Sequence, residues 1–490
     1  MNKILLANSY FLKHDPKEYK AMNLYAPLGT LYAASYLKKK GHDVALFDTM
    51  LADSEEDLRI ELNEHKPEVF VIYDDGFNYL TKMCLTRMRK AAFRMIKIAK
   101  DFGCTVILSG SDATDHIEKY FDHKCDYIIC GEGEITLCDL VDYLNSTHAK
   151  SLNEIDGLAY ISDGKIIFTN KRKALKDLDI LPFPAWELVD VEAYRKLWKS
   201  HHGFFSMNIV TTRGCPFHCN WCAKPIYGQV YNSRSPKNVV AEIKFLKENY
   251  SPDHLWFCDD IFGLKPDWIA KFSKAVNKES VKTKFKCLSR VDLLLKEDNI
   301  THLKAAGCES LWVGAESGSQ RILDAMDKGT TLEQIYESRK ILQKKNIRTG
   351  FFLQFGYSGE KKEDIKLTLK MVRDLMPDDI GISVSYPLPG TKFYKRVLTQ
   401  MRNKKNWEKS DDFEMMFDGE YTTEFYKVLH KKVHKEFRAR QILKTPVQRF
   451  RSLWKLPYYL AGWFLNTIKL KKLGKKEKSN GVTELIEVLN

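Results

Sequence analysis

The sequence lacks any long apolar run. No stretch of its 490 residues reaches about 18 consecutive apolar residues, the length that a membrane-spanning helix requires. The most apolar candidate, residues 456–468, is too short to span a bilayer. Residues 1–10 also lack an apolar core long enough for a secretory signal peptide. We therefore expect no spanning helix and a cytoplasmic location.

A disulfide framework is also not indicated. The chain has 11 cysteines, an odd number scattered over a long sequence. Secreted disulfide scaffolds are short and use paired cysteines, so this pattern favours a reducing compartment. Eight cysteines are expected to be small core residues. These are Cys84, Cys104, Cys125, Cys130, Cys138, Cys258, Cys287 and Cys308.

An even spread of positive charge is absent as well. The net charge is +14, yet residues 391–490 alone hold 23 basic and 11 acidic side chains. Coating of nucleic acid by the whole chain is therefore not expected. The basic, aromatic segment 438–476 favours a helical cap over the mouth of the preceding domain. The alternative is a surface that lies on a membrane and meets an amphiphilic substrate.

Residues 1–150 alternate short apolar runs with helical patterns. This alternation predicts a flavodoxin-like (Rossmann-like) doubly wound parallel sheet. The expected strands are residues 3–7, 43–47, 69–73, 105–108 and 127–130. Ligands of such sheets bind beyond the carboxyl ends of the strands, which here include residues 74–78, 110–114 and 131–134.

Residues 151–204 are expected to form a hairpin and a linker. Asp163 and Gly164 suit a tight turn within residues 158–169. Residues 181–190 carry two prolines and no helical period, which is typical of a linker that ends a domain.

Residues 205–395 resume the alternation of strands and helices. Six successive units predict a partial βα (TIM-like) barrel, with an open sheet as the alternative. The expected strands are residues 207–211, 254–258, 284–288, 310–313, 350–354 and 381–384. The strand pattern then stops, and residues 396–490 are expected to form a basic helical extension.

Three closely spaced cysteines follow the first strand of this second unit. Cys215, Cys219 and Cys222 lie within the segment TTRGCPFHCNWC, residues 211–222. Three thiolates on one loop can hold three corners of a metal site, and this strand end is where βα barrels place reactive groups. Spacing alone leaves three possibilities: an iron–sulfur cluster with one open iron, a zinc site with His218 as an awkward fourth ligand, or three buried thiols.

The segment CPFHCNWC, with Trp221 before the third cysteine, resembles the CxxxCxxC signature of the radical S-adenosylmethionine (SAM) superfamily. Further segments are similar to the successive βα units of that family. These are residues 234–246, 255–263, 288–292, 311–323, 350–360 and 383–394. The resemblance implies that Cys215, Cys219 and Cys222 hold a [4Fe–4S] cluster. SAM would bind the open iron and be cleaved by one-electron reduction to a 5′-deoxyadenosyl radical.

The resemblance also implies contacts to SAM. Trp221, Glu316 and Ser317 are expected beside the cosubstrate. Arg290 is expected to pair with its carboxylate, with an interdomain ion pair as the alternative. The segment Asp259–Asp260 either faces the pocket or caps a solvated loop.

Residues 26–48, 109–114 and 125–137 resemble the cobalamin-binding domain that precedes the barrel in one subgroup of the family. The resemblance implies that the cobalamin nucleotide loop meets Gly110, Ser111, Gly131, Glu132 and Gly133, and that residues 74–78 border the corrin. The cobalt-ligating pattern DxHxxG is absent. We therefore expect cobalamin without a lower histidine ligand, with an empty domain as the alternative.

Members of that subgroup methylate unreactive carbons or cyclise a chlorophyll precursor. We expect methylation of an unactivated carbon in a small or lipid-like metabolite, with flavodoxin or ferredoxin as electron donor. The alternatives are a radical cyclisation or rearrangement and, in a different class, a structural zinc-binding interaction protein. A tRNA-methylthiolating enzyme is disfavoured because no second three-cysteine loop is present.

Overall fold

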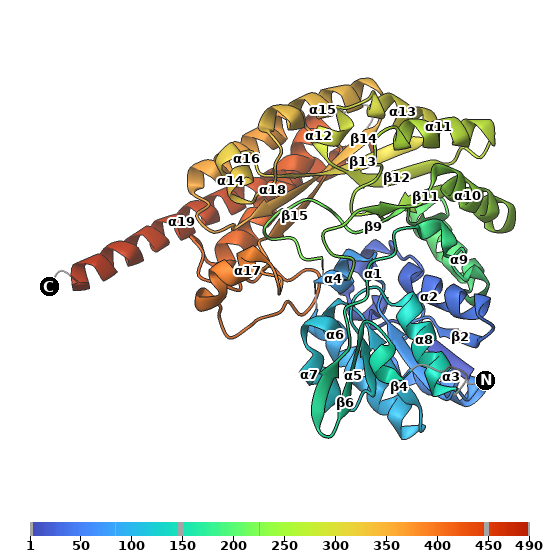
Figure 1. Ribbon diagram of the computed structural model, residues 1–490. Coiled ribbons are helices and arrows are strands. Elements are labelled where there is room, and N and C mark those ends of the chain that lie inside the picture. Colours follow the sequence, from blue (N-terminus) through green and yellow to red (C-terminus); the bar gives the residue numbers. More distant parts are fainter. Residues whose placement is uncertain (1–2, 84, 146–150, 225, 445–449, 489–490) are drawn as a thin grey trace.

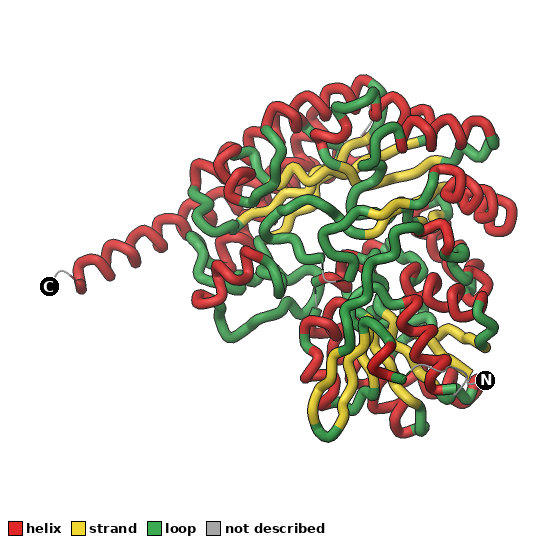
Figure 2. Tube along the Cα trace, in the orientation of Figure 1, coloured by secondary structure: helices red, strands yellow, loops and turns green. Residues whose placement is uncertain are grey.

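The computed structural model describes residues 3–83, 85–145, 151–224, 226–444 and 450–488. Two α/β domains follow one another along the chain and pack together, and two long helices complete the carboxyl end (Figure 1). Figure 2 shows most of the strands gathered into two large sheets. Cys84 lies outside the described residues.

The first domain contains a seven-stranded sheet in the order β2-β1-β3-β4-β5-β6-β7. Its first five strands are parallel and match the predicted ranges to within a residue. They are β1 (Lys3–Ala7), β2 (Asp43–Phe47), β3 (Val69–Tyr73), β4 (Thr105–Ser109) and β5 (Tyr127–Ile129). The hairpin of β6 (Leu158–Ser162) and β7 (Lys165–Phe168) pairs antiparallel to β5, so it extends this sheet.

Helices cover both faces of the first sheet, as a doubly wound fold requires. Apolar residues of α3 and α5 pack on one face, and those of α2 and α8 pack on the other. The helices are α1 (Pro16–Ala21), α2 (Leu28–Lys39), α3 (Leu58–His65), α4 (Tyr79–Lys82), α5 (Thr86–Asp101), α6 (Ser111–Asp115), α7 (Ile117–Asp122) and α8 (Glu134–Leu144).

The second domain contains six parallel strands in the order β15-β14-β13-β12-β11-β8. The strands follow chain order, and β8 and β15 form the two edges, so the predicted partial barrel is confirmed. The strands are β8 (Ser206–Ile209), β11 (His254–Phe257), β12 (Lys284–Ser289), β13 (Cys308–Glu316), β14 (Arg348–Phe355) and β15 (Asp379–Val384).

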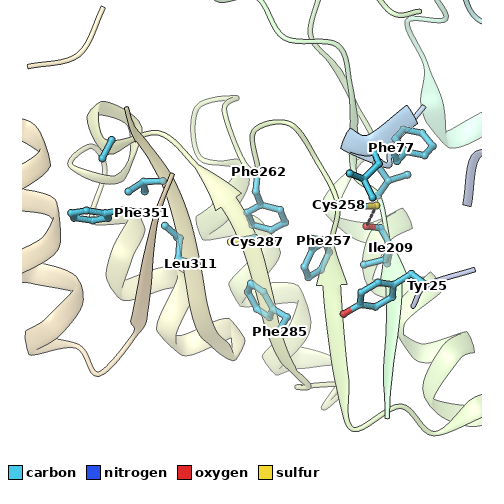
Figure 3. Close-up of a cluster of buried hydrophobic side chains, with 14 of the residues drawn as sticks. Tyr25, Phe77, Ile209, Phe257, Cys258, Phe262, Phe285, Cys287, Leu311 and Phe351 are labelled. Carbon is cyan, nitrogen blue, oxygen red and sulfur yellow. Dashed lines mark hydrogen bonds between the residues drawn. The ribbon is translucent and has the colours of Figure 1, made fainter. Parts of the chain in front are cut away.

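Alternate residues of these strands face opposite sides. Phe257, Phe285 and Leu311 are buried in the core, where Phe262 and Phe351 join them (Figure 3). The alternating positions, among them Trp256, Lys286 and Trp312, face the inside of the barrel. The surrounding helices are α9 (Val191–His202), α10 (Pro236–Tyr250), α11 (Trp268–Lys278), α12 (Val291–Leu294), α13 (Asn299–Ala306), α14 (Gln320–Ala325), α15 (Leu332–Lys344), α16 (Lys362–Leu375) and α17 (Lys392–Val397).

The predicted helical extension consists of α18 (Thr423–Lys444) and α19 (Leu456–Val488). Arg373 of α16 donates to Glu436 of α18 at 2.6 Å, which ties α18 to the barrel. Helix α19 packs against α18 and then projects from the body of the molecule (Figure 1). Among the described residues, no helix is long and apolar enough to cross a membrane.

The cysteines predicted to lie in the core do so with one partial exception. Six of the seven that the structure describes are buried, and Cys130 is half-buried. None of them forms a disulfide. These side chains therefore act as small apolar residues, as predicted.

Candidate active site

The three-cysteine loop runs from residue 214 to residue 231. The antiparallel pair β9 (Thr212–Arg213) and β10 (Asn232–Ser233) closes it at its base. Gly214 has a φ of +79°, and a Cβ there would lie 2.3 Å from the carbonyl oxygen of Val230. Glycine is therefore required where the two ends of the loop approach each other.

The three cysteines differ in exposure. Cys215 is buried, whereas Cys219 and Cys222 are partly exposed. Burial raises the pKa of the Cys215 thiol. A bound metal would offset this effect, because coordination favours the thiolate.

The spacing of the sulfur atoms separates a cluster from a single metal ion. Among the described residues, the only group of three or more ligand atoms within 4.8 Å of one another is His42, Cys138 and Asp142, so the three loop cysteines are spread more widely. Four ligands around one zinc ion, at about 2.3 Å each, would draw the sulfur atoms within about 4 Å. A cluster distributes its ligands over separate irons, so sulfur atoms that are not all within 4.8 Å of one another are compatible with a cluster.

Asn220 fixes the loop between the second and third cysteines. Its backbone nitrogen donates to Met326 O at 3.0 Å, and its side-chain amide donates to Ala325 O at 2.7 Å. Its side-chain oxygen accepts from the Tyr357 hydroxyl at 2.9 Å. Asn220 is buried and thus holds the loop against the end of α14 and the segment after β14. The motif did not indicate this role.

Two cations flank the loop. The guanidinium of Arg290 lies 3.6 Å from the centroid of the Phe217 ring. It also pairs with Asp292, at 3.0 Å from Nε to Oδ1, and donates to Lys328 O at 3.0 Å. The ion pair lies within one domain, so the interdomain alternative for Arg290 is wrong. Lys328, which no sequence pattern indicated, is the second cation.

Glu316 ends β13 in a left-handed conformation, with a φ of +54°. Its carboxylate accepts from Lys328 Nζ at 2.8 Å, and both residues are buried. Gly314 makes the pair possible, because a Cβ there would lie 2.4 Å from Glu316 Oε1. Burial alone would lower the pKa of Lys328, but the Glu316 carboxylate outweighs this effect and raises it.

The other two residues expected near SAM lie in different surroundings. The Ser317 hydroxyl is buried, bonds Thr368 of α16 at 3.1 Å and accepts from the backbone nitrogen of Ser319. Trp221 is half-buried, and its Nε1 has no hydrogen-bond partner among the described residues. Trp221, unlike Ser317, thus offers a donor, its Nε1–H, that is unused among the described residues.

Asp259 supports the strand that leads into the loop. Its carboxylate accepts from the backbone nitrogens of Thr211 and Thr212, both at 2.7 Å, and from both threonine hydroxyls. Asp259 is buried, so it fixes the approach to Cys215. Asp260 is exposed and lines a small groove.

Arg213 joins the cluster loop to the first domain. It pairs with Glu132 and Glu134, and all three side chains are buried. The rings of Tyr227, Phe77 and Tyr32 surround its guanidinium. The two carboxylates hold the pKa of Arg213 well above its usual range.

The residues expected near cobalamin line the edge of the first sheet that faces the barrel. Gly131 approaches the backbone of Ile226, with 3.6 Å from a notional Cβ to the carbonyl oxygen. Gly133 leaves no room for a Cβ beside Tyr73 and Ser109. The Ser111 hydroxyl is buried and, among the described residues, has no partner. Gly131 and Glu132 thus take part in interdomain packing, Gly133 packs within the first domain, and Ser111 keeps a polar atom without a partner among the described residues.

A cavity of about 250 Å³ lies between the two domains. The first domain contributes residues 75, 77, 78 and 80, which follow β3. The barrel contributes inward-facing residues of β8, β11, β12, β13 and β14. Asp75 accepts from the backbone nitrogens of Gly29 and Phe77, both at 3.0 Å, so it shapes the wall of this cavity.

Comparison with known proteins matches residues 209–372 to the radical SAM superfamily. The chain is 27% identical over 391 residues to an uncharacterized methyltransferase of Pyrococcus horikoshii, covering 78% of this chain and 81% of that protein. It is 26% identical over 387 residues to the anaerobic magnesium-protoporphyrin IX monomethyl ester cyclase of Rubrivivax gelatinosus, covering 76% of this chain and 66% of the cyclase.

Solved structures share the fold of both domains. The radical SAM methyltransferase TsrM of Kitasatospora setae, solved with cobalamin and a [4Fe–4S] cluster, has a TM-score of 0.67 at 17% identity, covering 81% of this chain and 75% of that one. The cobalamin-dependent radical SAM enzyme OxsB, solved with aqua-cobalamin, has a TM-score of 0.71 at 16% identity, covering 98% and 81%. Residues 209–372 therefore match the radical SAM superfamily, and the chain has the two-domain fold of these two solved structures.

Proposed function

We propose that this enzyme uses a [4Fe–4S] cluster, SAM and cobalamin to methylate an unactivated carbon of a small or lipid-like metabolite. The observation that carries the proposal is the set of three cysteines on a loop that Asn220 pins, beside the buried pair of Glu316 and Lys328. The match of the barrel to the radical SAM superfamily supports the same chemistry.

When bound, the cluster supplies the electron that cleaves SAM to a 5′-deoxyadenosyl radical, and cobalamin supplies a transferable methyl group. The residues of this chain hold and orient these groups. Cys215, Cys219 and Cys222 would ligate three irons. Glu316 offers a carboxylate to an ammonium or ribose hydroxyl, and Arg290 places a cation near the loop for a carboxylate.

The residues that would hold cobalamin lie between the two domains. Ser111, whose hydroxyl has no partner among the described residues, lines a small groove between the domains with Gly76 and Gly214 and offers a polar contact to a ligand there. Ser111 and residues 75–78 would thus hold the group. Gly131 and Glu132 contribute through the interdomain packing already described, because Glu132 is paired with Arg213.

Methyl transfer and cyclisation are both represented among the relatives, with four proteins named as methyltransferases or methylases and three named as cyclases. A hopanoid C-3 methylase of Methylococcus capsulatus, 24% identical over 389 residues, supports a lipid-like substrate class. The cavity also favours such a substrate, because most of its barrel side is apolar.

The test begins with anaerobically purified protein loaded with iron, sulfide and cobalamin. We expect about four irons and one cobalt per chain, and 5′-deoxyadenosine after reduction with SAM present. Flavodoxin or ferredoxin, the proposed electron donors, should support the same reaction when they are used in place of the chemical reductant dithionite. Iron without 5′-deoxyadenosine would contradict radical chemistry. Transfer of labelled methyl groups from SAM to product separates methylation from cyclisation.

We also propose that the 3-10 helix η7 (Phe450–Lys455) and α19 contact an anionic membrane surface. Large apolar side chains are exposed along this segment, among them Trp454 at 75% and Phe464 at 66%. Residues 458, 460, 464, 465 and 468 recur at helical spacing, and Lys469, Lys471 and Lys472 are exposed nearby. An apolar stripe bordered by lysines suits the headgroup region of a bilayer. The enzyme would then act in the cytoplasm at a membrane surface.

Co-sedimentation with vesicles tests this surface. Vesicles of phosphatidylserine and phosphatidylcholine should bind the protein at low salt, and pure phosphatidylcholine should bind it less. The double variant Trp454→Ser and Phe464→Ser should lose most of the binding. Phe168→Ser, which alters an equally exposed ring on the hairpin, should not. Failure to bind anionic vesicles would contradict the proposal.

A further inference from the structure

The barrel side of the interdomain cavity is lined by aromatic rings. Trp256, Trp312 and Phe352 come from three strands of the barrel, and Tyr25 comes from the first domain. The centroids of the Trp312 and Phe352 rings lie 4.8 Å apart. Gly350 permits this pair, because a Cβ there would lie 2.3 Å from the Trp312 ring. Glycine at position 350 thus leaves the space that the Trp312 ring occupies.

Lys286 of β12 places a single ammonium among these rings. Its Nζ lies 4.7 Å from the centroid of the Trp256 ring and 5.4 Å from that of Tyr25. Across the described residues, Lys286 forms no ion pair or hydrogen bond with another side chain. Burial lowers its pKa to about 8, so most of the population is still cationic near neutral pH. Lys286 is half-buried, and a ligand anion would stabilise its ammonium by supplying the partner that the surrounding rings lack.

Among the described residues, none of the other ionisable groups near Lys286 forms an ion pair with it. Glu18 of α1 lines the cavity and raises the pKa of Lys286, but it forms its contact with Lys17. The Cys258 thiol donates to Ile209 O at 3.2 Å. His254 is neutral, because burial lowers its pKa to about 3.

We infer that the cavity binds a ring-containing or otherwise bulky apolar substrate that carries an anionic group, and that this group pairs with Lys286. The inference rests on the proposed function, since it names the substrate class of that site. The rings would contact the apolar body, and the ammonium would hold the carboxylate or phosphate at one end. Asn208, whose side-chain oxygen has no partner among the described residues, would accept a hydrogen bond from the substrate.

Two matched probes test the inference. We would measure binding of 2-naphthaleneacetate and of 2-(2-naphthyl)ethanol to the cluster- and cobalamin-loaded protein by equilibrium dialysis, reading naphthalene fluorescence. The probes share the ring system and differ in the anion. The acid should bind about tenfold more tightly near pH 7, which corresponds to about 1.4 kcal/mol. The preference should fall as the pH rises through about 8, because the ammonium loses its proton.

Three variants separate charge from folding. Lys286→Met should remove the preference for the acid, and Lys286→Arg should keep it. Lys284→Met changes an exposed lysine of the same strand and should leave the preference unchanged. Iron content verifies folding in each case. Equal binding of the two probes, or a preference that survives in Lys286→Met, would overturn the inference. Formation of 5′-deoxyadenosine in the same preparations is an independent readout of the proposed function.

Discussion

Arg213, two residues before the first cluster cysteine, forms a buried ion pair with Glu134 of the first domain, with 2.6 Å between Nη2 and Oε1. The two side chains are only 3% and 2% exposed. The cluster loop is therefore attached to the first domain through a charged contact that water does not reach. Separation of the domains would leave both charges unpaired, so the pair favours a fixed relation between them.

Glu134→Gln should lower the free energy of unfolding by about 1.5–3 kcal/mol, because Arg213 loses a buried charged hydrogen bond while it keeps Glu132 as a partner. Anaerobic urea unfolding near pH 7 measures the change. Glu187→Gln breaks an exposed pair with Lys38 and should cost less than about 1 kcal/mol. Equal costs for the two variants would contradict a special role for the buried pair.

Replacement of any one of Cys215, Cys219 and Cys222 by alanine should reduce iron content and remove the brown absorbance, since each ligates one iron of the proposed cluster. Cys130→Ala, in the half-buried cysteine of the first domain, should retain both. Iron and zinc per chain provide the measurement. A zinc-containing wild type with little iron would refute the cluster.

Asn220→Ala should weaken cluster retention without removing a ligand. The substitution removes the hydrogen bonds of the side chain to Ala325 and Tyr357, so the loop loses its tie to α14. We expect iron to be lost to a chelator severalfold faster than from the wild type. Asn277→Ala, on the distant α11, is the control. Identical rates in the wild type and Asn220→Ala would show that the loop does not depend on this tie.

Glu316→Gln and Lys328→Met should each weaken SAM binding by about tenfold or more, because a charged hydrogen bond contributes about 1.5–3 kcal/mol. Iron content should stay near that of the wild type, since neither residue ligates the cluster. Equilibrium dialysis with labelled SAM gives the affinity. Lys340→Met, on the exposed side of α15, should bind SAM normally. Unchanged affinity in both test variants would remove Glu316 from the SAM site.

The sequence predicted the elements of both domains well, because apolar runs and helical periods depend on local order. It identified the three cysteines because their spacing is unusual. It did not identify Lys328, since its partner Glu316 is brought near only by the end of β13. It also interpreted Glu132 as a contact to cobalamin, whereas the side chain pairs with Arg213 of the other domain. Pairing between domains leaves no periodic trace in a sequence.

The last prediction concerns Glu360, whose fully buried carboxyl accepts from the backbone nitrogen of Gly356 at 2.7 Å. Burial raises the pKa of Glu360 from 4.5 to about 8. The folded protein therefore holds a proton that the unfolded chain releases between these values. The stabilisation is present in full below pH 4.5 and is lost as the pH rises through about 8.

Glu360→Gln keeps an acceptor for Gly356 and has no proton to lose. Relative to this variant, the free energy of unfolding of the wild type should fall by roughly 3 kcal/mol between about pH 5.5 and about pH 8.5. Anaerobic urea unfolding at several pH values measures the difference. Glu363→Gln, at an exposed position on α16, should follow the wild type. Parallel profiles for the wild type and Glu360→Gln would mean that Glu360 is ionised in the folded protein, and its second oxygen would then require a hydrogen-bond donor that the described residues do not supply.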